Sequence, residues 1–160
     1  MEDLKTKKLH FLLGTWTGNG NGKFPTITSF NYREILTFSI DGLNDLIHYE
    51  QKTWLTHNDT PSHWESGFIK PVENEENVFE ISNSQDSGRV EVLKGKLISN
   101  GENHTIHFKM KLIQNDPRMV NSERIFTMQQ DKLSYIVKMA TKNTPEHQQH
   151  LESTLNRELL

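Results

Sequence analysis

Alternation between apolar and polar residues constrains this chain more than any other feature of its sequence. In residues 30–40, 106–112 and 133–139, apolar side chains share one parity and polar side chains hold most of the other. A period of two is typical of β-strands that bury one face, because successive side chains point to opposite sides of the pleat. Weaker stretches of the same kind lie at 45–56, 63–72, 77–85, 88–99, 121–130 and 150–159.

Residues that favour tight turns separate these stretches. Asn100-Gly101 is the strongest hairpin signal, and Asp41-Gly42 and Gln130-Asp131 are similar. About ten strands in regular succession predict an all-β fold, an antiparallel up-and-down barrel. A β-sandwich with a similar number of strands stays open as an alternative, because periodicity does not distinguish the two folds.

Two segments depart from the strand pattern. Residues 3–13 carry leucines at helical spacing, with Asp3 as the N-cap and Gly14 as the stop. We expect a short amphipathic helix there, capping one end of the barrel. Residues 145–160 fit either a helix or a closing strand.

The composition narrows the classes of protein. The chain has 160 residues, a net charge of −3 and no cysteine. Without cysteine, a disulfide scaffold, a thiol nucleophile and a cysteine-ligated metal site are excluded. The charge balance gives no electrostatic footprint for nucleic acid or an anionic membrane. The apolar run at 11–13 is too short for a signal peptide or a membrane span, so we expect one cytoplasmic domain over residues 1–160.

A barrel of about ten strands is wider than one filled by its own side chains, so we expect an interior cavity. The inward faces are mostly apolar and aromatic, which suits a flat or apolar organic ligand. From the residues alone, two functions stay open. One is a carrier of an apolar small molecule such as a fatty acid, and the other is an interaction module whose cavity is incidental.

An alternating glycine run near the N-terminus is the most unusual segment. Gly18, Gly20 and Gly22 share one parity and would lie on one face of a strand. Glycine in a strand serves sharp curvature or the close approach of a ligand, and both interpretations stay open here. Trp16 shares this parity, so we expect it to face the cavity or the terminal helix.

The same run carries a resemblance to a known family. Gly14, Trp16, Gly18 and Gly20 have the spacing G-x-W-x-G-x-G, which resembles the motif of the nitrobindin family. Phe-Pro-Thr-Ile follows at 24–27, as it does in that family. Further matches occur in order along the chain, at 49–54, 63–68, 88–92, 133–135 and 150–155. The similarity therefore spans essentially the whole chain.

The resemblance implies a barrel related to lipocalins and fatty-acid-binding proteins that holds ferric heme b. It also implies binding of nitric oxide and isomerisation of peroxynitrite to nitrate. By position, His150 matches the family's proximal iron ligand, Thr26 matches a threonine at the heme site, and His63 matches a distal histidine. There His63 would donate a hydrogen bond or carry a proton. The expected partners are these small molecules, with the protein a monomer or homodimer, and residues near 151 would form a strand.

Without the resemblance, none of the eight histidines stands out as a ligand. His147 and His150 are three residues apart and would form half of a metal site on a helix, but no third ligand follows from the sequence. His63 and Glu65 share one parity, which is also how a hydrolytic base is held. The nucleophile motif G-x-S-x-G is absent from the sequence, so a hydrolase is not expected.

Overall fold

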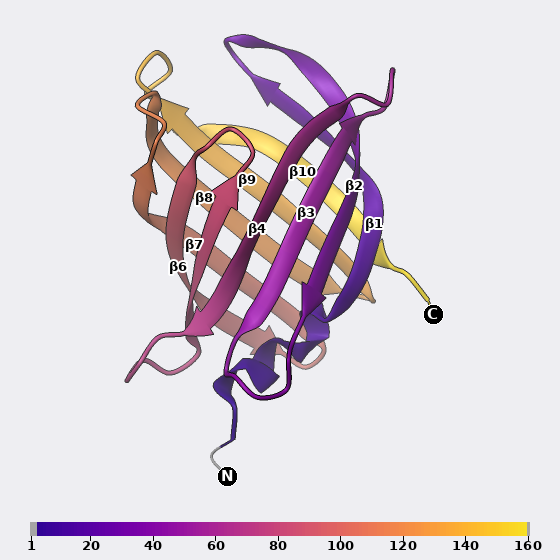
Figure 1. Ribbon diagram of the computed structural model, residues 1–160, viewed down its shortest axis with the longest axis vertical. Coiled ribbons are helices and arrows are strands. Elements are labelled where there is room, and N and C mark those ends of the chain that lie inside the picture. Colours follow the sequence, from indigo (N-terminus) through magenta and orange to yellow (C-terminus); the bar gives the residue numbers. More distant parts are fainter. Residues whose placement is uncertain (1–2, 160) are drawn as a thin grey trace.

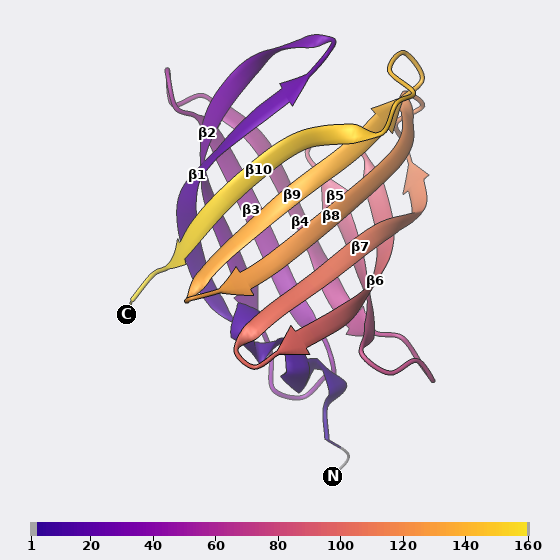
Figure 2. The same cartoon turned by 180° about the vertical axis from the view of Figure 1, so that it is seen from behind.

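Ten antiparallel strands close into a barrel in the computed structural model, which describes residues 3–159 (Figure 1). The strands are β1 (Gly14–Phe24), β2 (Ile27–Ser39), β3 (Ile47–Leu55), β4 (Pro61–Pro71), β5 (Val78–Gln85), β6 (Val90–Asn100), β7 (Asn103–Gln114), β8 (Met119–Gln129), β9 (Lys132–Thr141) and β10 (Gln148–Arg157). Each strand pairs with its neighbours in sequence, and β1 also pairs with β10, side by side in Figure 2. The up-and-down barrel is therefore confirmed, and the sandwich alternative is wrong.

The segment at 145–160 contains the closing strand β10, so its helical alternative is wrong. Antiparallel pairing with both β1 and β9 fixes this outcome, because the last strand satisfies two open sheet edges at once. Met1, Glu2 and Leu160, which the expected domain of 1–160 includes, lie outside the described residues.

The predicted alternation places the expected side chains in the core along most of each strand. Tyr32, Leu36 and Phe38 of β2 are buried, as are Leu133 and Tyr135 of β9. Leu36, Phe38, Leu133 and Tyr135 belong to one continuous apolar cluster inside the barrel.

The predicted inward face of 106–112 is correct at Ile106 and Phe108 but wrong at Leu112, whose side chain is exposed. The reason is a shift in the pairing of β6 with β7, where Val92 pairs with Leu112 and Leu93 pairs with Met110. One extra residue in a strand reverses the parity beyond it.

A short helix closes the lower end of the barrel in Figure 1. This helix, η1 (Lys5–Leu12), is a 3-10 helix that buries Leu9 and Leu12. The Trp16 indole Nε1 donates a hydrogen bond of 2.7 Å to the Leu12 carbonyl, and the Arg157 guanidinium lies 4.3 Å from the centre of the Trp16 ring. Trp16 therefore faces the terminal helix, one of its two predicted positions.

The start of η1 differs from the prediction. Leu4 occupies the N-cap position and its side chain makes no capping hydrogen bond. Asp3 instead accepts a hydrogen bond of 2.7 Å from the Lys7 ammonium. Nowhere in residues 3–159 is a helix long and apolar enough to cross a membrane.

The glycines of β1 allow close packing inside the barrel. A Cβ atom on Gly18 would clash with the backbone of β10 at Thr154. Cβ atoms on Gly20 and Gly22 would clash with the rings of Tyr32 and Phe30. The neighbouring strand and two aromatic rings, rather than a ligand, take the space that these side chains would fill.

The other end of the barrel, opposite η1, is irregular. Because the strands alternate in direction, the connections at 25–26, 56–60, 86–89, 115–118 and 142–147 all lie at that end. The strand register also shifts in that half, at Gly22/Phe24, Thr53/Trp54, Val92/Leu93, Met119/Asn121 and Gln149/Leu151. Such bulges are common at barrel rims and beside functional sites, because they redirect side chains.

Candidate functional site

Two adjoining cavities occupy the irregular end of the barrel. The inner one has a volume of about 230 Å³ and reaches toward Tyr49 and Arg124 in the interior. The outer one has a volume of about 640 Å³ and opens at the rim beside Thr26. Its size is within the range of roughly 300–1,000 Å³ found for small-molecule and cofactor sites. His150 borders both cavities, so it stands where they meet.

His150 reaches the cavities because of a bulge in β10. Gln149 pairs with Lys138 and Leu151 pairs with Val137, so His150 is an extra residue on its strand. Ser153 and Leu155 are buried, so the odd-numbered residues of β10 point into the barrel. If β10 were regular throughout, the even-numbered His150 would point outward. The bulge therefore redirects the imidazole into the site.

The orientation of the His150 ring is fixed by the backbone. Its Nδ1 lies 3.0 Å from the Lys23 carbonyl oxygen, which can only accept, so Nδ1 carries a proton. The rings of Phe24 and Phe30 flank the imidazole edge-on, with centroids 5.7 and 6.4 Å away. The lone pair of a neutral His150 is therefore on Nε2.

Electrostatics keep this imidazole neutral. Burial lowers the pKa of His150 from its ordinary value, against the raising effect of the hydrogen bond to Lys23, and the Arg89 guanidinium lowers it further. A neutral imidazole with a fixed N–H is the form that binds transition metals.

His63 lies across the barrel from His150. It belongs to β4, four strands from β10 in one direction around the barrel and six in the other. Thr53 pairs with His63 while Trp54 pairs with Pro61, so a bulge also stands next to this histidine. His63 borders the inner cavity with its ring part-buried. The inner cavity thus has a histidine on each of two facing walls.

Glu65 supports His63 from within the barrel. The Glu65 Oε1 atom lies 2.7 Å from His63 Nε2. Arg124 donates to both oxygens of the same carboxylate, at 2.8 and 3.0 Å, and the Tyr49 hydroxyl donates to Oε2. Burial acts to raise the pKa of Glu65, but the Arg124 guanidinium and the His63 hydrogen bond outweigh it and hold the pKa well below its ordinary value. Glu65 is therefore a buried carboxylate.

Thr26 lies in the turn between β1 and β2 and is exposed at the rim of the outer cavity. It shares that cavity with His150 but does not border the inner cavity with His63. His150 therefore shares one cavity with Thr26 and the other with His63, whereas Thr26 and His63 share none.

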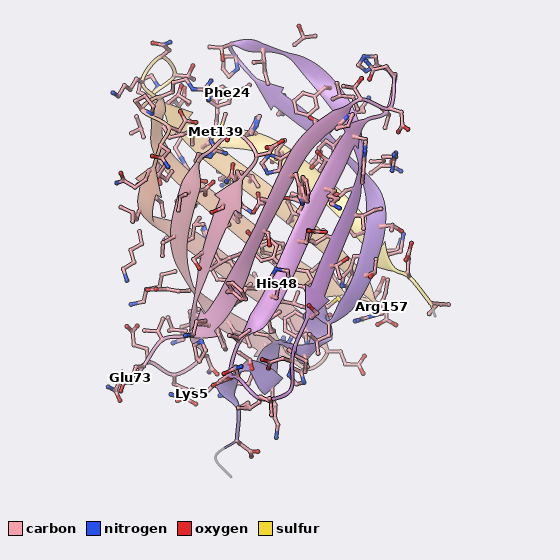
Figure 3. The ribbon with its side chains drawn as sticks, viewed as in Figure 1. Lys5, Phe24, His48, Glu73, Met139 and Arg157 are labelled. Atoms are coloured by element: carbon pink, nitrogen blue, oxygen red, sulfur yellow. The ribbon has the colours of Figure 1, made fainter. Side chains whose placement is uncertain are left out.

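The structure adds site residues that sequence reasoning missed. Arg89, Met119 and Met139 border both cavities. Figure 3 shows Met139 at the same end of the barrel as Phe24, far from Lys5. The sequence could have indicated Met139, because it alternates in step with the inward-facing residues Leu133 and Tyr135 of β9. For Arg89 and Met119 the sequence offered no such indication, because each lies beside a turn.

Sequence reasoning also missed three buried charged residues. Glu65, Glu91 and Arg124 occupy inward positions of their strands and are almost fully buried. Parity on each strand could have marked them, because each alternates with core residues. Their pairing could not have been found, since it joins strands that are far apart in the sequence.

The residues at the rim fit a heme. His150 offers one neutral nitrogen donor with its other nitrogen held by a carbonyl, as is usual for a histidine that binds a metal. The walls around it combine aromatic and apolar side chains with cations, which are Phe24, Phe30, Met119, Met139, Arg89, Arg118 and Lys142. A flat macrocycle whose metal is held by one histidine would match this donor set better than a small ion does. Among residues 3–159, no group of three or more histidine and acidic side chains is placed to hold a metal ion.

Comparisons with known proteins agree with this geometry. Residues 5–157 match the family model described as THAP4-like, heme-binding beta-barrel domain. A relative from Arabidopsis thaliana named peroxynitrite isomerase Rv2717c is 39% identical over 149 residues, covering 93% of this chain and 86% of the relative. Peroxynitrite isomerase 2 from Mycobacterium avium (strain 104) is 34% identical over 150 residues, covering 92% and 91%.

The crystal structure of Rv2717c from M. tuberculosis has the same fold. It matches with a TM-score of 0.88 and 26% sequence identity, covering 99% of this chain and 100% of that chain. The family resemblance found in the sequence is therefore confirmed over residues 5–157. This chain belongs to the family of THAP4-like, heme-binding β-barrel domains, whose similar members include proteins named peroxynitrite isomerase.

Proposed function

We propose that this protein binds ferric heme b through His150, binds nitric oxide, and isomerises peroxynitrite to nitrate. The observation that carries the proposal is the hydrogen bond of 3.0 Å from His150 Nδ1 to the Lys23 carbonyl. It leaves Nε2 as the lone-pair donor of a neutral imidazole at the junction of two cavities. The names of the relatives supply the substrate, and the geometry supplies a site for the cofactor.

Each side chain has a distinct part in this proposal. Bound heme would supply a ferric iron, a Lewis acid for an anionic substrate. His150 holds the group from one wall, and the Phe24 and Phe30 rings restrict the imidazole to one orientation. His63, on the facing wall, is the side chain placed to exchange a proton or a hydrogen bond with a ligand in the inner cavity. Thr26 offers a hydroxyl at the rim of the outer one.

The polar interior weighs against a fatty-acid carrier. A carrier needs a free polar group for the carboxylate and an apolar channel for the chain. Here the buried cation Arg124 is already bound by Glu65 and lies 3.5 Å from Glu91. A fatty-acid carboxylate would have to compete with these anions, and Arg89, a cation that borders both cavities, also lies 3.3 Å from Glu91.

A hemin titration tests the cofactor assignment. Visible absorption should show a saturable one-to-one shift of the Soret band with the wild-type protein and a loss of that shift with His150→Ala. His147→Ala is the matched control, because His147 lies beside Glu123 at 3.4 Å and borders neither cavity. Equal shifts in wild type and His150→Ala would remove His150 as the ligand.

Stopped-flow measurement of peroxynitrite decay tests the reaction. The heme-loaded protein should accelerate decay and raise the yield of nitrate over nitrite. His63→Leu should slow decay while the Soret band stays unchanged, because the substitution leaves His150 in place. An unchanged rate in His63→Leu would exclude His63 from the reaction. Titration of the reduced, heme-loaded protein with nitric oxide gives the binding stoichiometry.

A further inference from the structure

His63 is held by a carboxylate that is itself held in place. Glu65 lies two residues further along β4, on the same face, and its side chain is 1% exposed. The His63 Nε2 to Glu65 Oε1 distance is 2.7 Å. Arg124 of β8 donates a hydrogen bond to each Glu65 oxygen, so Glu65 cannot change its rotamer without breaking a buried ion pair.

The ionised state of Glu65 decides which ring nitrogen carries the proton. A carboxylate only accepts hydrogen bonds, so His63 Nε2 must be the donor. In a neutral imidazole the lone pair then lies on Nδ1. This Nδ1 is 3.7 Å from the Asp86 carboxylate, which is too long for a hydrogen bond. Nδ1 is therefore the nitrogen left for other partners.

We propose that Glu65, held in place by Arg124, is a positioning residue that fixes His63, which borders the inner cavity, as the Nε2–H tautomer and leaves Nδ1 as the acceptor nitrogen of its ring. A neutral His63 then accepts a hydrogen bond or a proton at Nδ1 and donates none there. The tautomer itself needs no cofactor. Only its effect on the reaction rests on the proposed function.

A second histidine–carboxylate pair gives a natural comparison. His107 Nε2 lies 2.6 Å from Glu123 on the outer surface of the barrel, where both side chains are partly exposed. Glu123 also lies 3.4 Å from His147, and neither His107 nor Glu123 borders a cavity. Changing Glu123 therefore makes the same chemical change outside the site.

The tautomer is tested by side-chain ¹⁵N NMR of His63 in the heme-free protein at neutral pH. Wild type should show a protonated Nε2 and an unprotonated Nδ1. Glu65→Gln should remove this strict preference and give a mixture of tautomers. Arg124 donates to both oxygen positions, so the amide can present either its oxygen or its NH₂ group to His63 Nε2. Glu123→Gln should leave the His63 signals unchanged.

A second variant covers the case in which Glu65→Gln fails to fold. Glu65→Leu/Arg124→Met removes both charges together, and well-packed apolar replacements of a buried pair are often tolerated. His63 should then populate both tautomers. A wild-type protein with the proton on Nδ1 would overturn the proposal, as would a ratio of the two tautomers that is the same with and without Glu65.

Kinetics of the heme-loaded protein test the consequence for the reaction. Glu65→Gln should slow peroxynitrite decay roughly tenfold, as is typical for residues that orient a functional histidine, without changing hemin affinity. Adding Glu65→Gln to His63→Leu should cause no further loss, because Glu65 acts through His63. Additive losses would show that Glu65 acts otherwise. Failure of wild type to bind hemin would reject the proposed function and leave the tautomer result standing.

Discussion

Glu34 and Glu65 are both buried, yet their surroundings move their pKa values in opposite directions. Glu65 faces the Arg124 guanidinium, which holds it ionised. Glu34 accepts hydrogen bonds from Tyr135 at 2.8 Å, from Ser153 at 2.9 Å and from Gln51, all of them uncharged. Burial outweighs these bonds and raises the pKa of Glu34. One barrel interior thus holds an ionised carboxylate and one that favours its neutral form.

The raised pKa of Glu34 predicts a pH dependence of stability. Its contribution is fully present below the unfolded-state pKa of 4.5 and is lost as pH rises toward the folded-state value. The free energy of unfolding of the wild type should therefore fall, relative to that of Glu34→Gln, as the pH rises above 4.5. Urea unfolding between acidic and neutral pH measures this. Parallel curves for wild type and Glu34→Gln would contradict it, and Glu102→Gln in an exposed turn is the control.

The Arg124–Glu65 pair predicts strong non-additivity. Arg124→Met leaves Glu65 buried without its cation and should cost about 3–5 kcal/mol. Glu65→Leu/Arg124→Met should cost less than Arg124→Met alone, because no uncompensated charge remains at Glu65. Denaturant unfolding of the single and double variants measures the coupling. A double variant less stable than Arg124→Met would disprove the charge argument.

At the scale of single elements, β1 and β10 depart from regular strands in opposite ways. β1 uses glycine to let its neighbours approach closely, at Gly18, Gly20 and Gly22. β10 uses an extra residue, His150, to turn a side chain into the site. The two devices meet at Lys23, whose carbonyl lies where the β1–β2 register shifts and accepts the His150 hydrogen bond.

Close packing at β1 predicts the effect of an added methyl group. Gly18→Ala should destabilise the protein by about 1–3 kcal/mol, because its Cβ meets the backbone of β10, which cannot rotate away. Gly22→Ala should cost less, since the Phe30 ring it meets is only part-buried and can turn. Thermal unfolding compares the two, with the exposed Asn19→Ala on the same strand as the control. An unchanged stability of Gly18→Ala would show that the backbone of β10 moves to accommodate the methyl group.

Across the whole molecule, the two ends of the barrel have different roles. The end covered by η1 has regular strand register and an apolar core that includes Leu9, Leu12 and Trp16. The opposite end has the register shifts, the cavities and the histidines that face each other. The most regular packing and the candidate site therefore lie at opposite ends of the barrel axis.

This separation predicts that damage at the closed end spares the site. Leu12→Ala should cost about 2–5 kcal/mol of stability, as expected for a buried leucine. Hemin affinity should stay within about threefold of wild type under conditions where the variant is folded, since η1 and the cavities lie at opposite ends. Parallel unfolding and hemin titrations measure both. A large loss of affinity with intact folding would show coupling between the ends.

How far the sequence predicts the site can be judged from its histidines. The parity of 63–72 correctly put His63 and Glu65 on one face, and their contact is observed. Parity could not have found His150, whose inward direction depends on a bulge. That residue came from the family resemblance alone. The Asp3 cap was wrong because the backbone N–H groups of Lys5 and Thr6 donate to the carboxylate of Asp45, a residue far away in the sequence.

Alternation, turn residues and the absence of cysteine determined where most strands lie in the chain, most of their inward faces and the excluded chemistries, because each depends only on local covalent geometry and residue type. Closure into a barrel, the redirected His150 and the bond between Glu65 and Arg124, 59 residues apart, were decided only by the tertiary structure. Strand register is a property of two chain segments at once. A shift by one residue reverses every side chain beyond it, so the site is defined by pairings that neither strand specifies alone.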